Sequence, residues 1–318
     1  MLAVLLALAA AAGYGGSDYA GGLAARRAGV VRVTVLAETT SVVLLACVIP
    51  FVSSRAPSWA SVLWGAAAGA SGVTGAMALY LGFRHAAFSV ASSVSAVGTA
   101  AFSVLAGLAL GERPGALSLA GISFALPAIV GVSAPAGRSG ADPAAQAGQA
   151  DPAAQQGADR AGGSAARAGR RHQPGTTGRH AAGVGLGLAA GAGFGLFFIG
   201  LSRAGSGSDL WPVVISQAAA LVTVTGVAVA TRQFGPPAAG ARLFAMLTGA
   251  IGAAGTICFF LATHLGLLAV TAVITSLYPA GTILLARILS GERLTALRII
   301  GLGLAAASVG LIAAGGAG

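Results

Sequence analysis

Long apolar runs dominate this chain and constrain its fold more than any other feature. Ten runs can be drawn, near residues 1–20, 32–52, 60–82, 86–110, 115–133, 183–203, 210–231, 242–263, 267–289 and 294–314. Each approaches the ~20 residues that a helix needs to cross the hydrocarbon core of a bilayer. Only 8% of the residues are charged, whereas a soluble domain carries roughly 25%. The sequence therefore predicts an all-α polytopic membrane protein with ten transmembrane helices.

The chain also repeats itself at an offset of 180 residues, which carries Gly111-Glu112-Arg113 onto Gly291-Glu292-Arg293. The same offset pairs Tyr14 with Phe194, Pro57 with Pro237, Gly69 with Gly249, Gly75 with Gly255, Tyr80 with Phe260 and Gly121 with Gly301. Each copy holds five apolar runs, and an odd number reverses the second copy across the bilayer. The duplication therefore predicts two inverted five-helix repeats, residues 1–134 and 182–318.

Residues 135–181, between the repeats, are rich in Ala, Gly, Gln, Pro, Asp and Arg and have almost nothing to bury. This composition predicts a disordered linker, and a weak attraction of its arginines to anionic headgroups is the alternative. Arginines gather in the linker and in the loops on the same side of the membrane. The positive-inside rule then makes the linker cytoplasmic and places both termini outside. Residues 1–12 resemble a signal-peptide core but are interpreted as part of the first transmembrane helix, because no basic residue precedes them.

Charge and motif content exclude several classes of function. The formal charge is +10 and comes entirely from arginine, but the arginines lie at helix ends and in the linker, which argues against nucleic-acid binding. Cys47 and Cys258 fall inside apolar runs, where a lone thiol acts as a small hydrophobe. The sequence contains no HExxH motif, no cluster of His and Cys, no pair of carboxylates spaced to share one helix face, and no phosphate-binding loop. We therefore expect no enzyme activity, cofactor or metal, and no direct use of ATP.

The two Gly-Glu-Arg turns, within 110–114 and 289–294, each have a glycine eight or nine residues further on and resemble the EamA domain of the drug/metabolite transporter superfamily. The segment 13–27, GYGGSDYAGGLAARR, is also similar to that domain. The resemblance covers both repeats and implies two inverted EamA units that transport, and commonly export, a small metabolite or drug. Many members have Trp where Tyr14 stands and a basic residue in the helix that carries Glu38. These departures leave the substrate open.

Two acidic residues, Asp18 and Glu38, can lie at membrane depth. A carboxylate at the bilayer centre costs roughly 2.5–3.5 kcal/mol, so such a group usually faces a cavity. Asp18 follows Tyr14 by one turn and, with Ser17, forms a polar patch; a plain interfacial position near the helix end is the alternative. Asp18 and Glu38 are the candidates for proton coupling.

Polar stripes on two helices that correspond in the repeat, together with matched aromatic pairs, predict a shared central cavity. The candidate lining residues are Tyr14, Ser17, Asp18, Tyr80, Ser92, Ser95, Thr99, Phe194, Phe260, Thr271, Thr275 and Tyr278. Core packing, or hydroxyls bonded back to their own helix, is the alternative for each taken singly. Pro279 is expected to distort the ninth helix beside Tyr278.

Glu112 and Glu292 each stand just before an expected helix. We interpret them as structural caps of the helices that follow, because a carboxylate complements the free amides and the dipole of a helix N-terminus.

Together these features predict a secondary transporter of the inner membrane that moves a small organic metabolite or drug by alternating access. Proton coupling and facilitated exchange both stay open, as does assembly into a homodimer. The alternatives are a translocator of a lipid-linked or cationic compound and, from another class, a non-transporting membrane scaffold or sensor.

Overall fold

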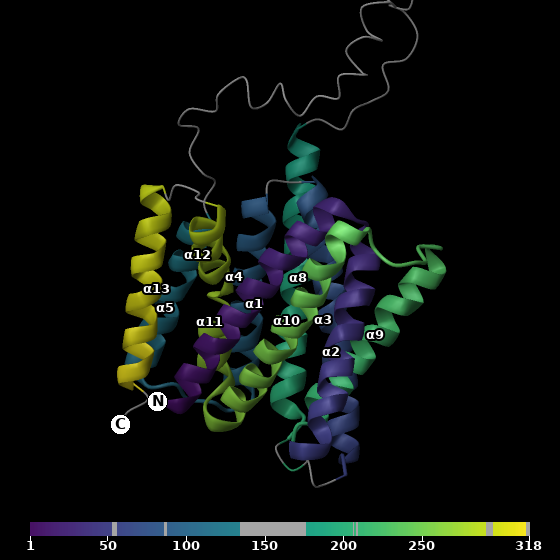
Figure 1. Cartoon of the computed structure of the whole chain (residues 1–318). Helices are drawn as coiled ribbons and strands as arrows, with labels where there is room; N and C mark the ends of the chain where they lie inside the picture. Colours follow the sequence, from purple (N-terminus) through teal and green to yellow (C-terminus); the bar gives the residue numbers. More distant parts are fainter. Residues whose placement is uncertain are drawn as a thin grey trace, which may run out of the picture.

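The computed structural model describes residues 1–52, 56–85, 88–133, 176–205, 207, 209–290 and 295–315, and contains no β-strand within these ranges (Figure 1). The helices are α1 (Leu2–Arg27), α2 (Val30–Val52), α3 (Trp59–His85), α4 (Phe88–Ala109), α5 (Ala116–Val132), α8 (Thr176–Arg203), α9 (Trp211–Ala230), α10 (Ala239–Leu265), α11 (Leu268–Thr275), α12 (Tyr278–Ser290) and α13 (Ala296–Gly315). In the described part of the chain, eight helices are long and apolar enough to cross a membrane. A helix satisfies its own backbone polar groups, as a chain in lipid must. The prediction of an all-helical polytopic membrane protein is confirmed.

The helix boundaries differ from the expected runs at several places, and two of these matter for the fold. α8 begins at Thr176, inside the predicted linker, whose residues 135–175 lie outside the described part. The ninth run is broken: α11 ends at Thr275 and α12 begins at Tyr278. Pro279 has no backbone N–H to continue the helical hydrogen bonds, so the break falls where the sequence predicts a distortion.

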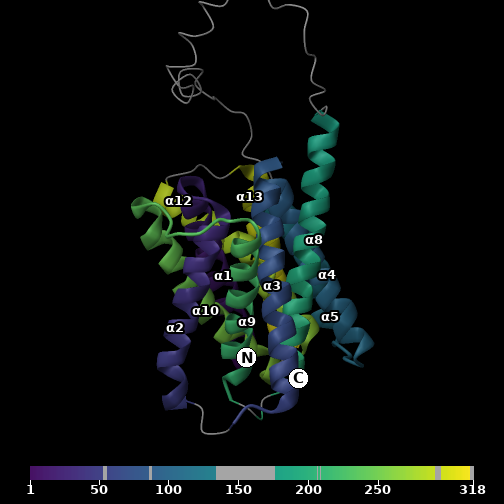
Figure 2. The ribbon, with the colours of Figure 1, turned by 90° about the vertical axis from the view of Figure 1, so that its right-hand side faces the viewer.

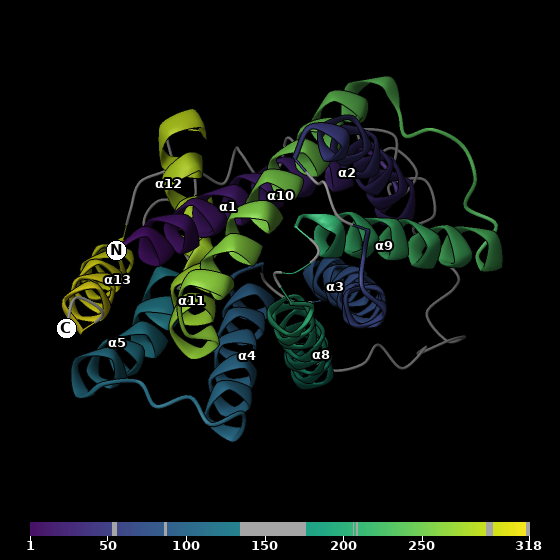
Figure 3. The same cartoon turned by 90° about the horizontal axis from the view of Figure 1, so that it is seen from below.

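The most extensive helix contacts join the first half of the chain to the second. α1 packs along α10, α3 along α8, and α5 along α13. Figure 3 shows α5 and α13 at one edge of the bundle, and α3 packed between α8 and α9. Figure 2 shows α3 and α8 running side by side. Exchanging the two halves turns the α1–α10 contact into the α8–α3 contact.

Glycines set the distance between these helices. A Cβ atom on Gly13 would lie 2.9 Å from the Cα of Gly255, and one on Gly193 would lie 2.7 Å from the Cα of Gly75. The two contacts are related by the offset of 180. A Cβ on Gly249 would overlap the carbonyl oxygen of Ala37 in α2. Because lipid gives apolar helices no reason to associate, close backbone approach of this kind supplies their attraction.

The Gly111-Glu112 turn explains how α4 ends and α11 begins. The Glu112 N–H donates to the Gly107 carbonyl and the Gly111 N–H to that of Leu108, at 2.9 and 3.0 Å. This is a Schellman ending, with Gly111 at a φ of 90° that favours glycine.

The Glu112 carboxylate then accepts the N–H groups of Leu268 and Ala269 at 2.7 and 2.9 Å. The sequence predicted that Glu112 would cap α5, the helix that follows it. It caps α11 of the other half instead, because the turn directs the side chain across the interface. Glu292 lies outside the described residues.

We predict that Gly249→Ala lowers the free energy of unfolding by about 1–3 kcal/mol, because the new methyl group forces α10 away from α2. Thermal unfolding in detergent measures the effect. Gly226→Ala is the matched control, because nothing lies within 4 Å of its Cβ position; it should be neutral or stabilise by about 0.5–1 kcal/mol. Equal stability of the two variants would contradict the close packing.

We predict that Glu112→Gln lowers stability by about 1.5–3 kcal/mol, since an amide cannot accept both N–H groups as a carboxylate does. Chemical unfolding in mixed micelles measures the difference. Arg113→Gln, a change at the exposed neighbour, should leave stability nearly unchanged. A wild-type unfolding curve for Glu112→Gln would show that the cap is dispensable.

Candidate functional site

A cavity of about 140 Å³ lies between the two halves of the chain. α1, α2, α3 and α4 line it from the first half, and α8, α9, α10 and α12 from the second. Its polar lining residues are Tyr14, Ser17, Asp18, Thr34, Glu38, Ser41, Tyr80, Thr99, Gln217, Thr248, Thr256 and Tyr278. A space of this size holds several water molecules or a small organic molecule.

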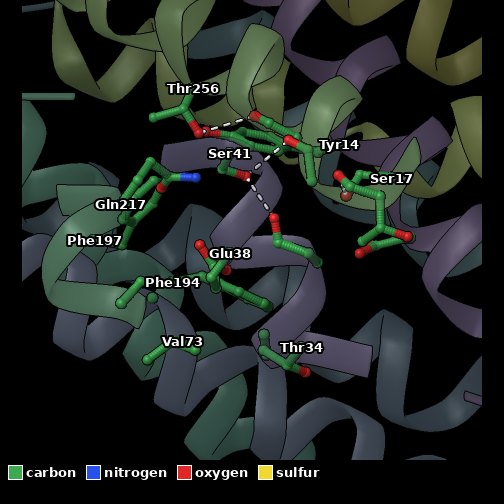
Figure 4. Close-up of a pocket in the computed structure, with 18 of the residues that line it drawn as sticks. Tyr14, Ser17, Thr34, Glu38, Ser41, Val73, Phe194, Phe197, Gln217 and Thr256 are labelled. Carbon is green, nitrogen blue, oxygen red and sulfur yellow. Dashed lines mark hydrogen bonds between the residues drawn. The ribbon is translucent and has the colours of Figure 1, made fainter. Parts of the chain in front are cut away.

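Hydroxyl groups tie the cavity walls together across the α1–α10 and α2–α10 contacts. Tyr14 donates to Thr256 Oγ1 at 3.2 Å, and Ser41 donates to the carbonyl oxygen of Gly249 at 2.8 Å (Figure 4). Ser17 donates to the carbonyl oxygen of Thr248 at 2.9 Å. These bonds orient side chains on three helices toward one space.

Two carboxyl groups face the same cavity, Asp18 from α1 and Glu38 from α2. Both lie within electrostatic range of the Tyr80 hydroxyl. Glu38 Oε2 is buried without a hydrogen-bond partner. Figure 4 shows the Glu38 side chain in the middle of the lining residues, among Ser41, Phe194 and Thr34. A buried carboxyl oxygen with no partner costs free energy that a ligand or a proton can recover.

Aromatic rings form a cluster at the cavity, to which Tyr14 and Phe198 contribute lining side chains. Phe198 stacks on Tyr14 with ring centroids 6.1 Å apart, and on the fully buried Phe259 with centroids 4.0 Å apart. α1 rises from the N-terminus in Figure 1 and α8 descends toward the same end. The cluster therefore lies on the side of the chain termini relative to Asp18 and Phe194.

The structure brings together most, but not all, of the residues predicted to line a cavity. Those that line it are Tyr14, Ser17, Asp18, Glu38, Tyr80, Thr99, Phe194 and Tyr278. Ser92, Ser95, Thr271 and Thr275 do not; they are buried in the packing of α4 and α11. Phe260 is also absent from the lining and packs on His264, with ring centroids 4.3 Å apart.

Sequence reasoning missed Thr34, Ser41, Gln217, Thr248 and Thr256, as well as Phe197 and Phe198. Helical spacing could have found two of them, because residues three and four positions from Glu38 share its face. Gln217 is a polar side chain in an otherwise apolar run, which is a signal of the same kind as Glu38.

Within the described ranges, no group of three or more His, Cys, Asp or Glu side chains lies together where it could hold a metal ion.

The fold and the site define a polytopic helical membrane protein with an internal, acid-containing cavity. A crystal structure described only as "Crystal structure of protein" has a TM-score of 0.67 to this chain at 17% sequence identity, covering 97% of this chain and 95% of that one. At this identity the likeness concerns the fold alone. No protein-family model and no curated protein matches the chain.

We predict that Phe259→Ala destabilises the protein by about 3–5 kcal/mol, the cost of emptying a fully buried aromatic site. Unfolding in detergent measures it. Phe124→Ala on α5, where the ring is 43% exposed, is the control and should cost clearly less. A cost no larger than that of the control would mean that the stack of Phe198 and Phe259 contributes little to stability.

Proposed function

We propose that this chain is a secondary transporter that carries a small organic molecule across the inner membrane by alternating access, as an exporter of the EamA type. The observation that carries the proposal is the cavity containing Asp18 and Glu38, set at membrane depth between helices of both halves. Carboxyl groups at that depth are expensive and mark substrate or proton pathways.

An inverted repeat of ten transmembrane helices is part of this proposal, and paired contacts support it. The contact of Gly121 with Ile312 has a counterpart at the offset of 180 in that of Gly301 with Val132. Figure 1 supports it too, because α1 and α8, the first helices of the two halves, run in opposite directions. In a carrier built from inverted repeats, the inward-open state becomes the outward-open state when each half adopts the conformation that the other half had.

The broken helix supports the same function. α11 and α12 are separated at Ser276 and Leu277, and Tyr278, the first residue of α12, lines the cavity. Transporters commonly place the ends of discontinuous helices at their substrate sites, because free backbone groups there can bind ligands.

The arginine distribution supports an orientation with the linker in the cytoplasm. Arg27 ends α1 and Arg242 lies in the first turns of α10, both at the end of the bundle from which α8 descends. By the positive-inside rule that end is cytoplasmic. The aromatic cluster of Tyr14, Phe198 and Phe259 then lies on the outer side of Asp18.

A non-transporting scaffold or sensor is the competing function, and alternating access separates the two. In a variant lacking Cys47 and Cys258, a single cysteine replaces Ser17, and impermeant thiol reagents are applied from either side of the membrane. A carrier exposes this cysteine to both sides in turn. Thr39→Cys is the control. It lies on the exposed face of α2 within a candidate membrane span, where lipid keeps water-soluble reagents away, so it should not react. Reaction from one side only, under every condition, would favour a sensor.

We predict that proteoliposomes show counterflow of at least one compound from a radiolabelled panel of amines, amino acids, sugars and nucleosides. Asp18→Asn and Glu38→Gln should each slow that exchange roughly tenfold or more, because each removes a membrane-depth carboxylate. Repeating the assay with and without a pH gradient tests proton coupling. Absence of counterflow for the whole panel would argue against the transport function.

A further inference from the structure

The cavity is lined by two chemically different walls, although the halves that build it correspond in sequence. At the offset of 180, the α1 residues Tyr14, Ser17 and Asp18 correspond to Phe194, Phe197 and Phe198 of α8. α1 therefore presents phenol, hydroxyl and carboxyl groups, whereas α8 presents three phenyl rings. Such a cavity suits a molecule with one polar end and one apolar end.

Three hydroxyl groups of the cavity lining are already committed as donors. Ser17 donates to the Thr248 carbonyl at 2.9 Å, Ser41 to that of Gly249 at 2.8 Å, and Thr34 to that of Val30 at 3.0 Å. Each hydroxyl has one hydrogen and spare lone pairs. Toward a ligand these groups can only accept hydrogen bonds, which favours a ligand that donates them.

The charged residues of the cavity lining favour the same kind of ligand. Asp18 and Glu38 both line the cavity, and no arginine, lysine or histidine is among the lining residues of the described chain. Glu38 Oε2 is buried with no hydrogen-bond partner. An anionic ligand would find no countercharge there, whereas a cation would supply the missing partner.

We propose that the cavity binds an organic cation with an apolar, ring-sized body. The ammonium group lies at Asp18 and Glu38, where the neighbouring hydroxyl oxygens accept its N–H groups. The ring lies against Phe194 and Phe197, and phenyl and phenol faces add attraction to the cation. This proposal rests on the transport function in one respect, since it names the class of molecule that would be carried.

Binding is measured by isothermal titration of the full chain in lipid nanodiscs, with four benzyl compounds that differ in charge. Benzylammonium and benzyltrimethylammonium are the cations, phenylmethanesulfonate is the anion, and phenylalanine is the zwitterion. We expect both cations to bind about tenfold or more tightly than the anion and the zwitterion. Tighter binding of phenylalanine would overturn the proposal, because it would show that the N-terminus of α12 holds a carboxylate. Preference for the sulfonate, or equal affinities, would overturn it as well.

Two variants test the two walls separately. Glu38→Gln should weaken binding of both cations about tenfold or more. Phe194→Leu should weaken benzyltrimethylammonium but leave tetramethylammonium, which has no ring, nearly unchanged. Thr39→Val is the control on the exposed face of α2, one residue from Glu38, and should bind like the wild type. Loss of binding in the control, or no loss in Glu38→Gln, would contradict the assignment.

The binding site and the transport function can fail independently in this design. Cations that bind with the expected selectivity but show no counterflow in proteoliposomes would uphold the site and reject the carrier. Counterflow of neutral or zwitterionic compounds that benzyltrimethylammonium does not inhibit would uphold the carrier and reject this substrate class.

Discussion

The fold depends on close backbone contact between glycines of opposite halves. Gly13 meets Gly255, and Gly75 meets Gly193, so α1 and α10 pack as closely as α3 and α8 do. In lipid, apolar side chains gain nothing by leaving the solvent, so close contact of this kind and hydrogen bonds between helices hold the bundle together. One turn beyond Gly13, Ser17 faces Gly252 across the same contact. The helices stay close there because serine is small. The lining becomes polar at this point, because Ser17 carries a hydroxyl group where Gly13 carries only a hydrogen atom.

Helices, their break and the acids of the site could be predicted from the sequence, because each has a local physical cause. Apolar length specifies a membrane helix, Pro279 interrupts one, and Asp18 and Glu38 are too costly at membrane depth unless a cavity receives them. The facing of individual hydroxyls could not be predicted. Thr99 lines the cavity and Ser95, one turn earlier on the same face of α4, does not; that difference depends on how far along α4 the cavity extends.

The role of Glu112 shows a second limit of local reasoning. Its position before α5 predicted a cap on that helix, yet its partners are the amides of Leu268 and Ala269, 156 and 157 residues away. α11 spans only Leu268–Thr275, too short to be stable alone. A cap from the other half fixes where it starts, and its end at Thr275 fixes where Tyr278 enters the cavity. The Gly-Glu turn thus influences the site from outside it.

The two halves share their contacts and differ in their cavity chemistry, and the difference lies where the side chains face inward. Small residues recur at the offset of 180 at several close helix contacts, such as Gly13 with Gly193 and Gly75 with Gly255, because they permit the approach. Positions that face the cavity carry no such constraint, so Asp18 can correspond to Phe198 without changing a helix contact. A symmetric pair of acids would place repelling charges on both walls of a small cavity. An aromatic wall on α8 adds no further negative charge to Asp18 and Glu38 and gives the site a direction, with a place for the charged end of a ligand and another for its ring.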